Sequence, residues 1–338
     1  MIRILNLVSL LFFLACEGRI SDAQLNKASV LLDANLSKKQ SKNDGHEVLS
    51  IKFSTPPKLL GEQEKKYCEK VNQKFFQYGW GNSDCDRFKW IWVRRSYWGN
   101  IIPWVVAGEK EEVDASTTII FCGVHGDEIT PIKFCYDIME FVNGLGDKLK
   151  GHRVVIAPLV TPDSFLKKYP TRTNARGVDA NRNFPTKDWD KDAIRLWKTR
   201  YGSASRRFPG VKSKSEQEVY FQMNLINRYK PQKIISVHAP LTIIDYDGPE
   251  STHDDKEHVG KSLLVQMSKK ADGYRVKNYP FFPGSLGNWA GNERGIPTYT
   301  LELPTSDNRL HKKYWDKFRP AILYAITHHF KVSNVVEK

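Results

Sequence analysis

No apolar stretch beyond the first residues of this sequence is long enough to cross a bilayer as a helix, which needs about 20 residues. The apolar run at residues 4–15 follows a lone Arg3 and contains only two polar residues. This run is too short for a membrane span, and it has the length of the hydrophobic region of a secretory signal. We therefore interpret residues 1–23 as an export signal.

Two routes of processing remain open for this signal. Ala15 and Cys16 resemble the end of a bacterial lipobox, in which the cysteine receives a lipid, although Phe13 and Leu14 fit that pattern poorly. Residues 21–23, Ser-Asp-Ala, instead offer the small residues that precede ordinary signal cleavage. The first route predicts a lipid on Cys16 and attachment to the membrane, and the second predicts release after export.

Cysteine is scarce, and none of the five cysteines lies in the CxxC pair that is typical of a structural zinc site. Export into an oxidising compartment allows the four cysteines beyond Cys16 to pair. Cys68 and Cys85 flank a short aromatic segment, so they are candidates for a disulfide with each other. Cys122 and Cys135 fall in a predicted strand and a predicted helix, where we expect buried free thiols.

The sequence also lacks internal repeats and nucleic-acid-binding motifs, yet it is strongly basic, with a net charge of +14. A basic surface favours polyanionic surroundings such as anionic lipid, a bacterial cell wall or nucleic acid. Because export separates a protein from nucleic acid, we expect no nucleic-acid partner. The charge therefore indicates where the protein resides rather than what it catalyses.

Composition divides the chain into an arm and one compact domain. Residues 24–60 are polar and rich in lysine, which is typical of a loosely ordered arm or linker. We expect residues 61–86 to form a short N-terminal extension with a helix-like segment, and residues 87–330 to form a single catalytic domain. At the start of this domain, residues 88–109 alternate apolar and polar residues around a turn, which predicts a hairpin.

Strand-like and helix-like segments alternate along the compact domain. The expected strands are residues 117–124, 153–160, 233–239 and 298–304, and the expected helices are residues 130–144, 215–229 and 258–270. Ser215 stands where an N-cap of the second helix is expected. This alternation predicts an α/β fold, with a mixed, largely parallel central sheet and helices on both faces.

Chemically competent side chains stand where these strands end. His125 and Glu128 follow the first strand, His238 ends the third, and Glu302 lies near the end of the fourth. Ligands bind beyond the carboxyl ends of strands in such sheets. Two imidazoles and a carboxylate are a donor set of catalytic zinc, although an HxxE pair is weak evidence when it stands alone. The chain has no HExxH motif.

Five sequence blocks in one order strengthen this interpretation. They are His125 to Glu128, residues 161–164 (TPDS), Arg172 to Pro185, SVHAP around His238, and TLELP around Glu302. Over residues 87–330 this pattern resembles the zinc carboxypeptidases of the carboxypeptidase A superfamily. Within that superfamily, the RTNARGVD block, the HAP after the strand and GSLGNWA look most like the bacterial murein peptide amidases.

The resemblance implies one zinc ion per chain. His125, Glu128 and His238 would be the ligands, and zinc held in this way acidifies water and polarises a carbonyl. Glu302 would be the general base that takes a proton from water and delivers it to the leaving amine. A lone carboxylate in an apolar strand is costly, which favours this role for Glu302 over a purely structural one.

The resemblance also assigns three residues of the Arg172 to Pro185 block to the substrate. Arg172 would stabilise the oxyanion, and Asn181 with Arg182 would bind a terminal carboxylate, because a guanidinium presents two parallel donors to two oxygens. A tyrosine that assists related enzymes has no clear counterpart, and Tyr279 only lies near its expected place. The residue that would line a side-chain pocket falls near Gly287, so the sequence gives no sign of a preference for basic residues.

The sequence therefore predicts an exported zinc metallopeptidase in a bacterium, either periplasmic or a membrane-anchored lipoprotein. Its expected substrate is a peptidoglycan peptide or muropeptide, cleaved at the γ-D-glutamyl–meso-diaminopimelate amide bond. One alternative is a secreted metallocarboxypeptidase that removes C-terminal residues from ordinary peptides. Another is an inactive relative that only binds cell-wall peptide.

Overall fold

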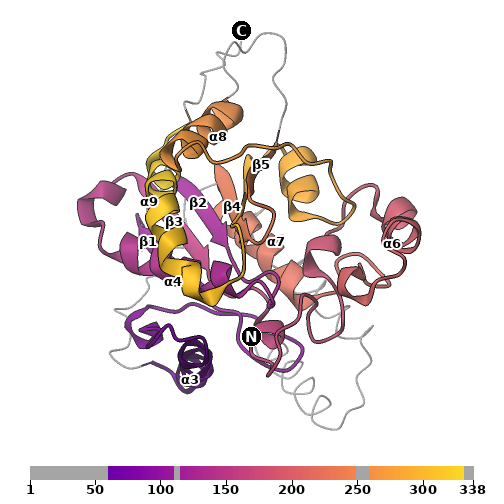
Figure 1. Ribbon diagram of the computed structural model, residues 1–338, viewed down its shortest axis with the longest axis horizontal. Coiled ribbons are helices and arrows are strands. Elements are labelled where there is room, and N and C mark those ends of the chain that lie inside the picture. The colour runs from indigo at the N-terminus through magenta and orange to yellow at the C-terminus, as the bar shows by residue number, and fades with distance from the viewer. Residues whose placement is uncertain (1–59, 110–114, 249–258, 331–338) are drawn as a thin grey trace, which may run out of the picture. The chain divides into compact units, whose positions relative to one another are not determined.

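The computed structural model describes residues 60–109, 115–248 and 259–330. Its centre is a six-stranded sheet in the order β1-β3-β2-β4-β6-β5 (Figure 1). The four inner strands are parallel, whereas β1 and β5 pair antiparallel at the two edges, so the predicted α/β fold with a mixed, largely parallel sheet is confirmed. The strands are β1 (Val105–Gly108), β2 (Ser116–Phe121), β3 (His152–Ala157), β4 (Lys233–His238), β5 (Ile243–Asp247) and β6 (Thr298–Glu302).

Helices connect the strands and cover the sheet. The α-helices are α3 (Glu62–Gln77), α4 (Ile129–Asn143), α5 (Pro162–Phe165), α6 (Ile194–Thr199), α7 (Gln217–Tyr229), α8 (Val259–Lys270) and α9 (His311–Thr327). Short helical turns are η1 (Cys85–Arg87), η2 (Gly146–Leu149), η3 (Ala180–Arg182), η5 (Ser205–Arg207) and η7 (Asn308–Leu310), and two π-helical turns are η4 (Trp189–Ala193) and η6 (Gly287–Asn292). Within the described residues, no helix has the length and apolar character that crossing a bilayer requires.

The sheet divides the apolar core into two parts. Side chains alternate between the faces of a strand, so on β2 Ile120 packs into one core while Ile119 and Phe121 pack into the other. Helices α4, α8 and α9 supply apolar residues to the first core, and α9 lies across that face in Figure 1. Helix α7 and the η6 turn supply the second core. Both faces are therefore covered, which leaves the strand ends as the place for a site.

Helix α7 begins later than the sequence predicted. Ser215 was the expected N-cap, but the N-cap is Glu216 and no side chain caps the helix. The reason is Asn183, whose Oδ1 accepts hydrogen bonds from the backbone N–H groups of Ser215 (2.8 Å) and Glu216 (3.2 Å). This amide side chain thereby ties the start of α7 to the loop at residues 180–185.

The predicted hairpin at residues 88–109 is reduced to two isolated antiparallel bridges. They join Ile91 to Trp104 and Arg95 to Ile101. The second arm then continues into β1, which pairs with β3 and becomes an edge strand of the main sheet. The predicted export signal, residues 1–23, and all but the last residue of the predicted arm at 24–60 lie outside the described residues.

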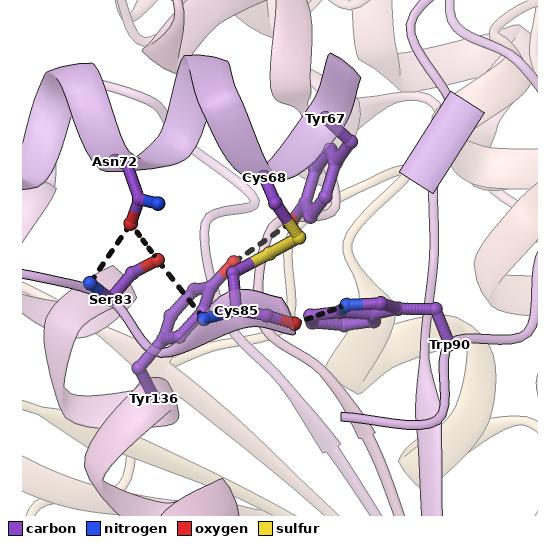
Figure 2. The surroundings of a disulfide bond; sticks show 7 residues. All are labelled: Tyr67, Cys68, Asn72, Ser83, Cys85, Trp90 and Tyr136. Atoms are coloured by element: carbon purple, nitrogen blue, oxygen red, sulfur yellow. Dashed lines mark hydrogen bonds between the residues drawn. A yellow bond between two sulfur atoms is a disulfide. The ribbon is translucent and has the colours of Figure 1, made fainter. Parts of the chain in front are cut away.

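A disulfide joins α3 to the segment before the sheet. Cys68 on α3 and Cys85 in η1 form the pair that their placement in the sequence suggested (Figure 2). Around it, the hydroxyls of Tyr67 and Tyr136 lie 3.2 Å apart, and the indole N–H of Trp90 donates to the Cys85 carbonyl at 2.8 Å. Because Tyr136 belongs to α4, these contacts fasten residues 62–87 to the catalytic domain.

The expectation of free thiols at Cys122 and Cys135 is wrong, because these residues form a second disulfide. Both side chains are fully buried. Cys122 follows β2 directly and Cys135 lies inside α4, and the short connection between them folds the helix back over the strand. Their α-carbons are consequently 6.2 Å apart, within the range that a disulfide spans.

Candidate active site

The carboxyl ends of the inner strands bring the candidate residues together. His125 lies in the loop after β2, Glu128 is the N-cap residue of α4, and His238 and Glu302 are the last residues of β4 and β6. His238 and Glu302 are direct partners in the parallel β4–β6 register. The sheet therefore brings four side chains together at one edge, although they lie up to 177 residues apart in the sequence.

His125, Glu128 and His238 form a compact group of possible metal ligands. One ligand atom from each residue lies within 4.8 Å of the others, and all three residues are buried. The Nδ1 atom of His125 is 2.7 Å from Glu128 Oε1, and the Nδ1 atom of His238 is 2.9 Å from Glu128 Oε2. Both imidazoles thus turn their Nδ1 atoms toward the carboxylate, so that nitrogen and oxygen donors face one another, as ligands of one cation do.

The opposite ring nitrogens are held by other polar groups. His125 Nε2 lies 3.1 Å from Asp179 Oδ1, and His238 Nε2 lies 2.9 Å from Ser236 Oγ. Ser236 stands two residues before His238 on β4, so both side chains point to the same side of the strand. Partners of this kind fix the tautomer and the orientation of metal-binding imidazoles.

Sequence reasoning assigned no role to Asp179 or Ser236. Asp179 lies within the Arg172 to Pro185 block, and the alternation of a strand could have pointed to Ser236. Asp179 is fully buried and accepts hydrogen bonds from Arg172 Nε (2.8 Å) and the Asn181 backbone N–H (3.0 Å) as well. Burial alone would raise the pKa of Asp179, but Arg172 and His125 hold that pKa well below its usual value. Asp179 is therefore an anion that fixes the positions of His125, Arg172 and Asn181 through hydrogen bonds.

Glu128 carries the negative charge that a ligand of a metal cation needs. Burial alone would raise the pKa of Glu128, but the charges and hydrogen bonds of His125 and His238 hold that pKa well below its usual value. An ionised carboxylate and two imidazoles with fixed orientation are ligands that catalytic zinc uses, and such zinc keeps a further position open. The residues present therefore fit a zinc ion.

Glu302 lies beside this group without joining it. Its Oε2 accepts a hydrogen bond from the backbone N–H of Leu241 at 3.2 Å. Burial raises the pKa of Glu302, and the negative charge of Glu128 contributes to the same shift. A carboxylate whose pKa is raised toward neutrality is a better proton acceptor, as general-base catalysis requires.

Arg172 reaches the group from the loop after α5. Its Nη1 donates to Glu128 Oε1 at 3.1 Å, and its Nε donates to Asp179 Oδ2 at 2.8 Å. The guanidinium is consequently fixed next to the ligand carboxylate. A positive charge held in this way needs no reorganisation when negative charge develops close to it.

One cavity of about 520 Å³ contains all seven residues that the sequence singled out. They are His125, Glu128, Arg172, Asn181, Arg182, His238 and Glu302. On its wall, Asn181 Oδ1 accepts from the Leu286 backbone N–H at 2.8 Å, and the Arg182 guanidinium lies 4.7 Å from the centre of the Phe282 ring. Tyr279 also lines this cavity, so a tyrosine is present near the place where the sequence left its role open.

Two further sets of charged residues line the cavity. The first comes from the basic run at residues 198–207, which contributes Arg200, Arg206 and Arg207 to the wall. The second is Asp245 and Asp247 on β5. The sequence prediction missed this strand, although IIDYD alternates apolar and acidic residues as a strand with one polar face does.

Sequence comparison identifies proteins that are related to this chain. The profile of the zinc carboxypeptidases matches residues 82–321. Murein peptide amidase A of Vibrio campbellii is 30% identical over 207 residues, which are 60% of this chain and 76% of that protein. Murein peptide amidase A of Escherichia coli K12 is 29% identical over 203 residues, which are 58% of this chain and 75% of that protein.

Solved structures share the fold. Bovine thrombin-activatable fibrinolysis inhibitor, solved in complex with tick carboxypeptidase inhibitor, has a TM-score of 0.59 at 19% identity, over 79% of this chain and 96% of that chain. Carboxypeptidase A from Helicoverpa armigera has a TM-score of 0.57 at 17% identity, over 93% of this chain and 84% of that chain. At these identities the likeness establishes the architecture alone.

The profile match covers more than half of the sequence, and it includes every residue of the zinc-compatible group and its cavity. The mixed sheet, the three possible metal ligands at its edge and the buried glutamate beside them form one consistent arrangement. The chain therefore belongs to the zinc carboxypeptidase family, and it is a zinc metallopeptidase.

Proposed function

We propose that this protein hydrolyses peptidoglycan-derived peptides at the γ-D-glutamyl–meso-diaminopimelate amide bond. The observation that carries the proposal is the convergence of His125, Glu128 and His238 with Glu302 in one cavity. The amide-bond specificity is supported by the similarity to the two murein peptide amidases over about three quarters of their length.

Each residue then has a chemical role in the reaction. When bound by His125, Glu128 and His238, zinc supplies a Lewis acid that polarises a carbonyl and acidifies water. Glu302 accepts the proton of the attacking water and delivers it to the nitrogen of the leaving amine, so that the carboxylate is regenerated. Its raised pKa suits both transfers.

The cationic side chains orient the substrate. Arg172 presents N–H donors beside the reacting carbonyl, where negative charge develops. Asn181 and Arg182 bind the carboxylate of the residue that leaves, because a guanidinium matches two carboxylate oxygens. Their side chains line the same cavity as the zinc-compatible group, which supports this assignment.

The charge of the cavity favours a substrate with several carboxylates. In a γ-linked glutamyl residue the α-carboxylate remains free, so muropeptide stems carry more negative charge around the scissile bond than ordinary peptides do. Arg200, Arg206 and Arg207 supply positive charge on the wall, beyond the residues already assigned to catalysis. Such charges attract and orient an anionic substrate.

A muropeptide digest tests the proposal against the two alternatives. The purified zinc-loaded protein should cleave a γ-D-glutamyl–diaminopimelate substrate, detected by mass, and leave L-peptides with free C-termini intact. Release of C-terminal residues from ordinary peptides would instead support a general carboxypeptidase. Tight binding of muropeptide without cleavage would support the inactive relative, which the presence of all three ligands and Glu302 argues against.

We also propose that the protein is exported in a bacterium, as a periplasmic protein or as a lipoprotein anchored through Cys16. The hydrophobic run at residues 4–15 supports this, and so do the two disulfides, which persist in oxidising compartments. Cell fractionation and the mass of the mature N-terminus test it. A lipid on Cys16 predicts a membrane-bound protein that Cys16→Ser releases, whereas a cytoplasmic protein with an intact N-terminus would contradict export.

A further inference from the structure

The strand β5 carries two acidic side chains into the active-site cavity. It pairs antiparallel with β6, so that Ile243 lies opposite Glu302, Asp245 opposite Thr300 and Asp247 opposite Thr298. Directly paired residues point to the same face of a sheet, and so do residues two apart on one strand. Ile243, Asp245 and Asp247 consequently share the face of Glu302, and all of them line the cavity.

The register also gives the distance of these carboxylates from the reaction centre. A strand rises about 3.3 Å per residue, so Asp245 stands about 7 Å and Asp247 about 13 Å along the sheet from the position of Glu302. Both lie on the side away from the strand end. The cavity therefore extends from the zinc-compatible group down to an acidic floor, which we define as Asp245 and Asp247.

The acidic floor has no positive partner among the residues that the structure describes. Asp245 is 6% exposed, and its Oδ1 accepts from the backbone N–H groups of Tyr246 and Tyr279, both at 3.0 Å. No hydrogen bond from a described residue reaches its Oδ2, and no described cation forms an ion pair with either carboxylate. Asp245 is buried and Asp247 is partly buried, so their negative charges are unfavourable without a counter-charge, and a cationic group in the cavity would relieve the cost.

The pKa values of Asp245 and Asp247 reflect the same lack of a positive partner. Burial raises the pKa of Asp245 to about 6, with the charge of Glu302 adding to the shift. Burial also raises the pKa of Asp247 to about 7, and the neighbouring charge of Asp245 contributes. A cation held close to either group would lower these values again.

The sequence had indicated no preference for basic residues, because a glycine, Gly287, falls at the pocket-lining position. The structure shows why the glycine is needed. A β-carbon at Gly287 would come within 1.7 Å of Asp247 Oδ2, so only glycine leaves room for this carboxylate. The negative charge missing from residue 287 is supplied instead by Asp247 at the end of strand β5.

We propose that Asp245 and Asp247 bind a primary ammonium group at the far end of the side chain of the leaving residue. This inference rests on the proposed function, because it concerns the same cavity and the same bond. In an extended side chain, the distal amine of lysine or diaminopimelate is five bonds of about 1.5 Å from its α-carbon, and because successive bonds zigzag the two atoms lie about 6 Å apart. That reach matches the span from the reaction centre to Asp245.

A matched pair of substrates isolates the ammonium group. γ-D-glutamyl-L-lysine and γ-D-glutamyl-L-norleucine have the same carbon skeleton, and only the first carries the amine. Diaminopimelate and 2-aminopimelate form a second pair, in which both members keep the distal carboxylate. We expect kcat/KM to be about 10- to 100-fold higher for the amine-bearing member of each pair, as for one hydrogen-bonded charge.

The variant Asp245→Asn then tests the carboxylate that the amine can reach, because the amide keeps the volume and the Oδ1 acceptor of Asp245 and removes its charge. It should lower kcat/KM for the two amine-bearing substrates by the same factor and leave the norleucine and 2-aminopimelate substrates unchanged. Asp272→Asn is the control, since Asp272 is an exposed residue paired with Lys317. Zinc content and melting temperature show whether each variant is folded, and the wild-type substrate ratios test the inference even if Asp245→Asn does not fold.

Two results overturn the inference and differ in meaning. Equal wild-type rates within each pair, or an Asp245→Asn variant that loses the same factor on both members, would overturn the ammonium site and leave the hydrolase proposal standing. Failure of the zinc-loaded wild type to cleave any of the four substrates would overturn the proposed function, and this inference with it.

Discussion

His238 and Glu302 are direct neighbours in the register of the two parallel strands β4 and β6. The first belongs to the zinc-compatible group and the second accepts a backbone hydrogen bond beside it. Hydrogen bonding of two strands therefore fixes the position of Glu302, the proposed base, relative to His238, a proposed metal ligand. This relationship makes the role of Glu302 separable from metal binding.

Replacing Glu302 by Gln should abolish hydrolysis and preserve the metal site. The amide keeps the volume of the side chain but cannot accept the proton of water, so we expect kcat to fall by at least about 100-fold. Zinc content, measured by mass spectrometry, should stay the same. Glu69→Gln on the exposed side of α3 is the matched control. Unchanged turnover in Glu302→Gln would contradict the assigned role.

Replacing Asp179 by Asn should weaken metal binding without removing a ligand. The variant loses the anion that holds His125 Nε2 and Arg172 Nε. Loss of such a partner lowers metal affinity by about 10- to 100-fold. Competition with a chelator measures the zinc affinity, and Asp192→Asn, at a partly exposed ion pair with Arg195, serves as the control. If the affinity of Asp179→Asn equals that of the wild type, Asp179 does not organise His125.

Glu218→Gln should stabilise the protein at high pH. Burial raises the pKa of Glu218 from 4.5 to about 7, and one of its oxygens has no hydrogen-bond partner among the described groups. As pH rises from about 4.5 to about 7, the unfolded state loses this proton before the folded state, so the folded state becomes less stable. The neutral amide avoids that loss.

We therefore expect Glu218→Gln to be more stable than the wild type at pH 8 by about 1–3 kcal/mol, and the difference to shrink toward pH 4.5. Denaturant unfolding at several pH values measures it. The hydrogen bond from Asn174 Nδ2, 3.0 Å from Glu218 Oε2, can be kept by the amide oxygen. A constant difference at all pH values would show that the charge of Glu218 is not responsible.

Removing the Cys122–Cys135 disulfide should destabilise the catalytic domain. The bond closes a loop across 13 positions. Without it the unfolded chain gains conformational entropy, which lowers the stability of the folded state by about 3 kcal/mol for a loop of this size. The double variant to Ala should show this loss in denaturant unfolding. Variants of Cys68 and Cys85 provide the comparison, because that bond closes a similar loop across 17 positions. Unchanged stability on reduction would mean that the buried pair packs equally well as thiols.

Much of the central sheet could be predicted from the sequence. The structure has strands β2, β3, β4 and β6 within the expected residues 117–124, 153–160, 233–239 and 298–304. The exceptions are the first residues of β2 and β3, which lie one position before the expected ranges. Inner parallel strands are buried on both faces, so they read as nearly continuous apolar runs. Strand β5 was missed because an edge strand that faces a polar cavity carries acidic residues in place of such a run.

The hairpin and the second disulfide show a different limit of prediction from the sequence. Apolar alternation at residues 88–109 indicated extended chain, but pairing with β3 depends on segments that are distant in the sequence. In the same way, nothing local to Cys122 and Cys135 indicates that α4 turns back over β2. Their bond follows from the approach of helix and strand.

The sequence by itself determined the order of the elements and the residue types at the strand ends, because both are local patterns of burial and of donor chemistry. It specified two histidines, two glutamates and a block of arginine and asparagine residues as candidates. Only the tertiary structure decided which of their neighbours cooperate. Asp179, Ser236 and the acidic floor act through register and packing between distant segments, and no periodicity of a single segment contains that information.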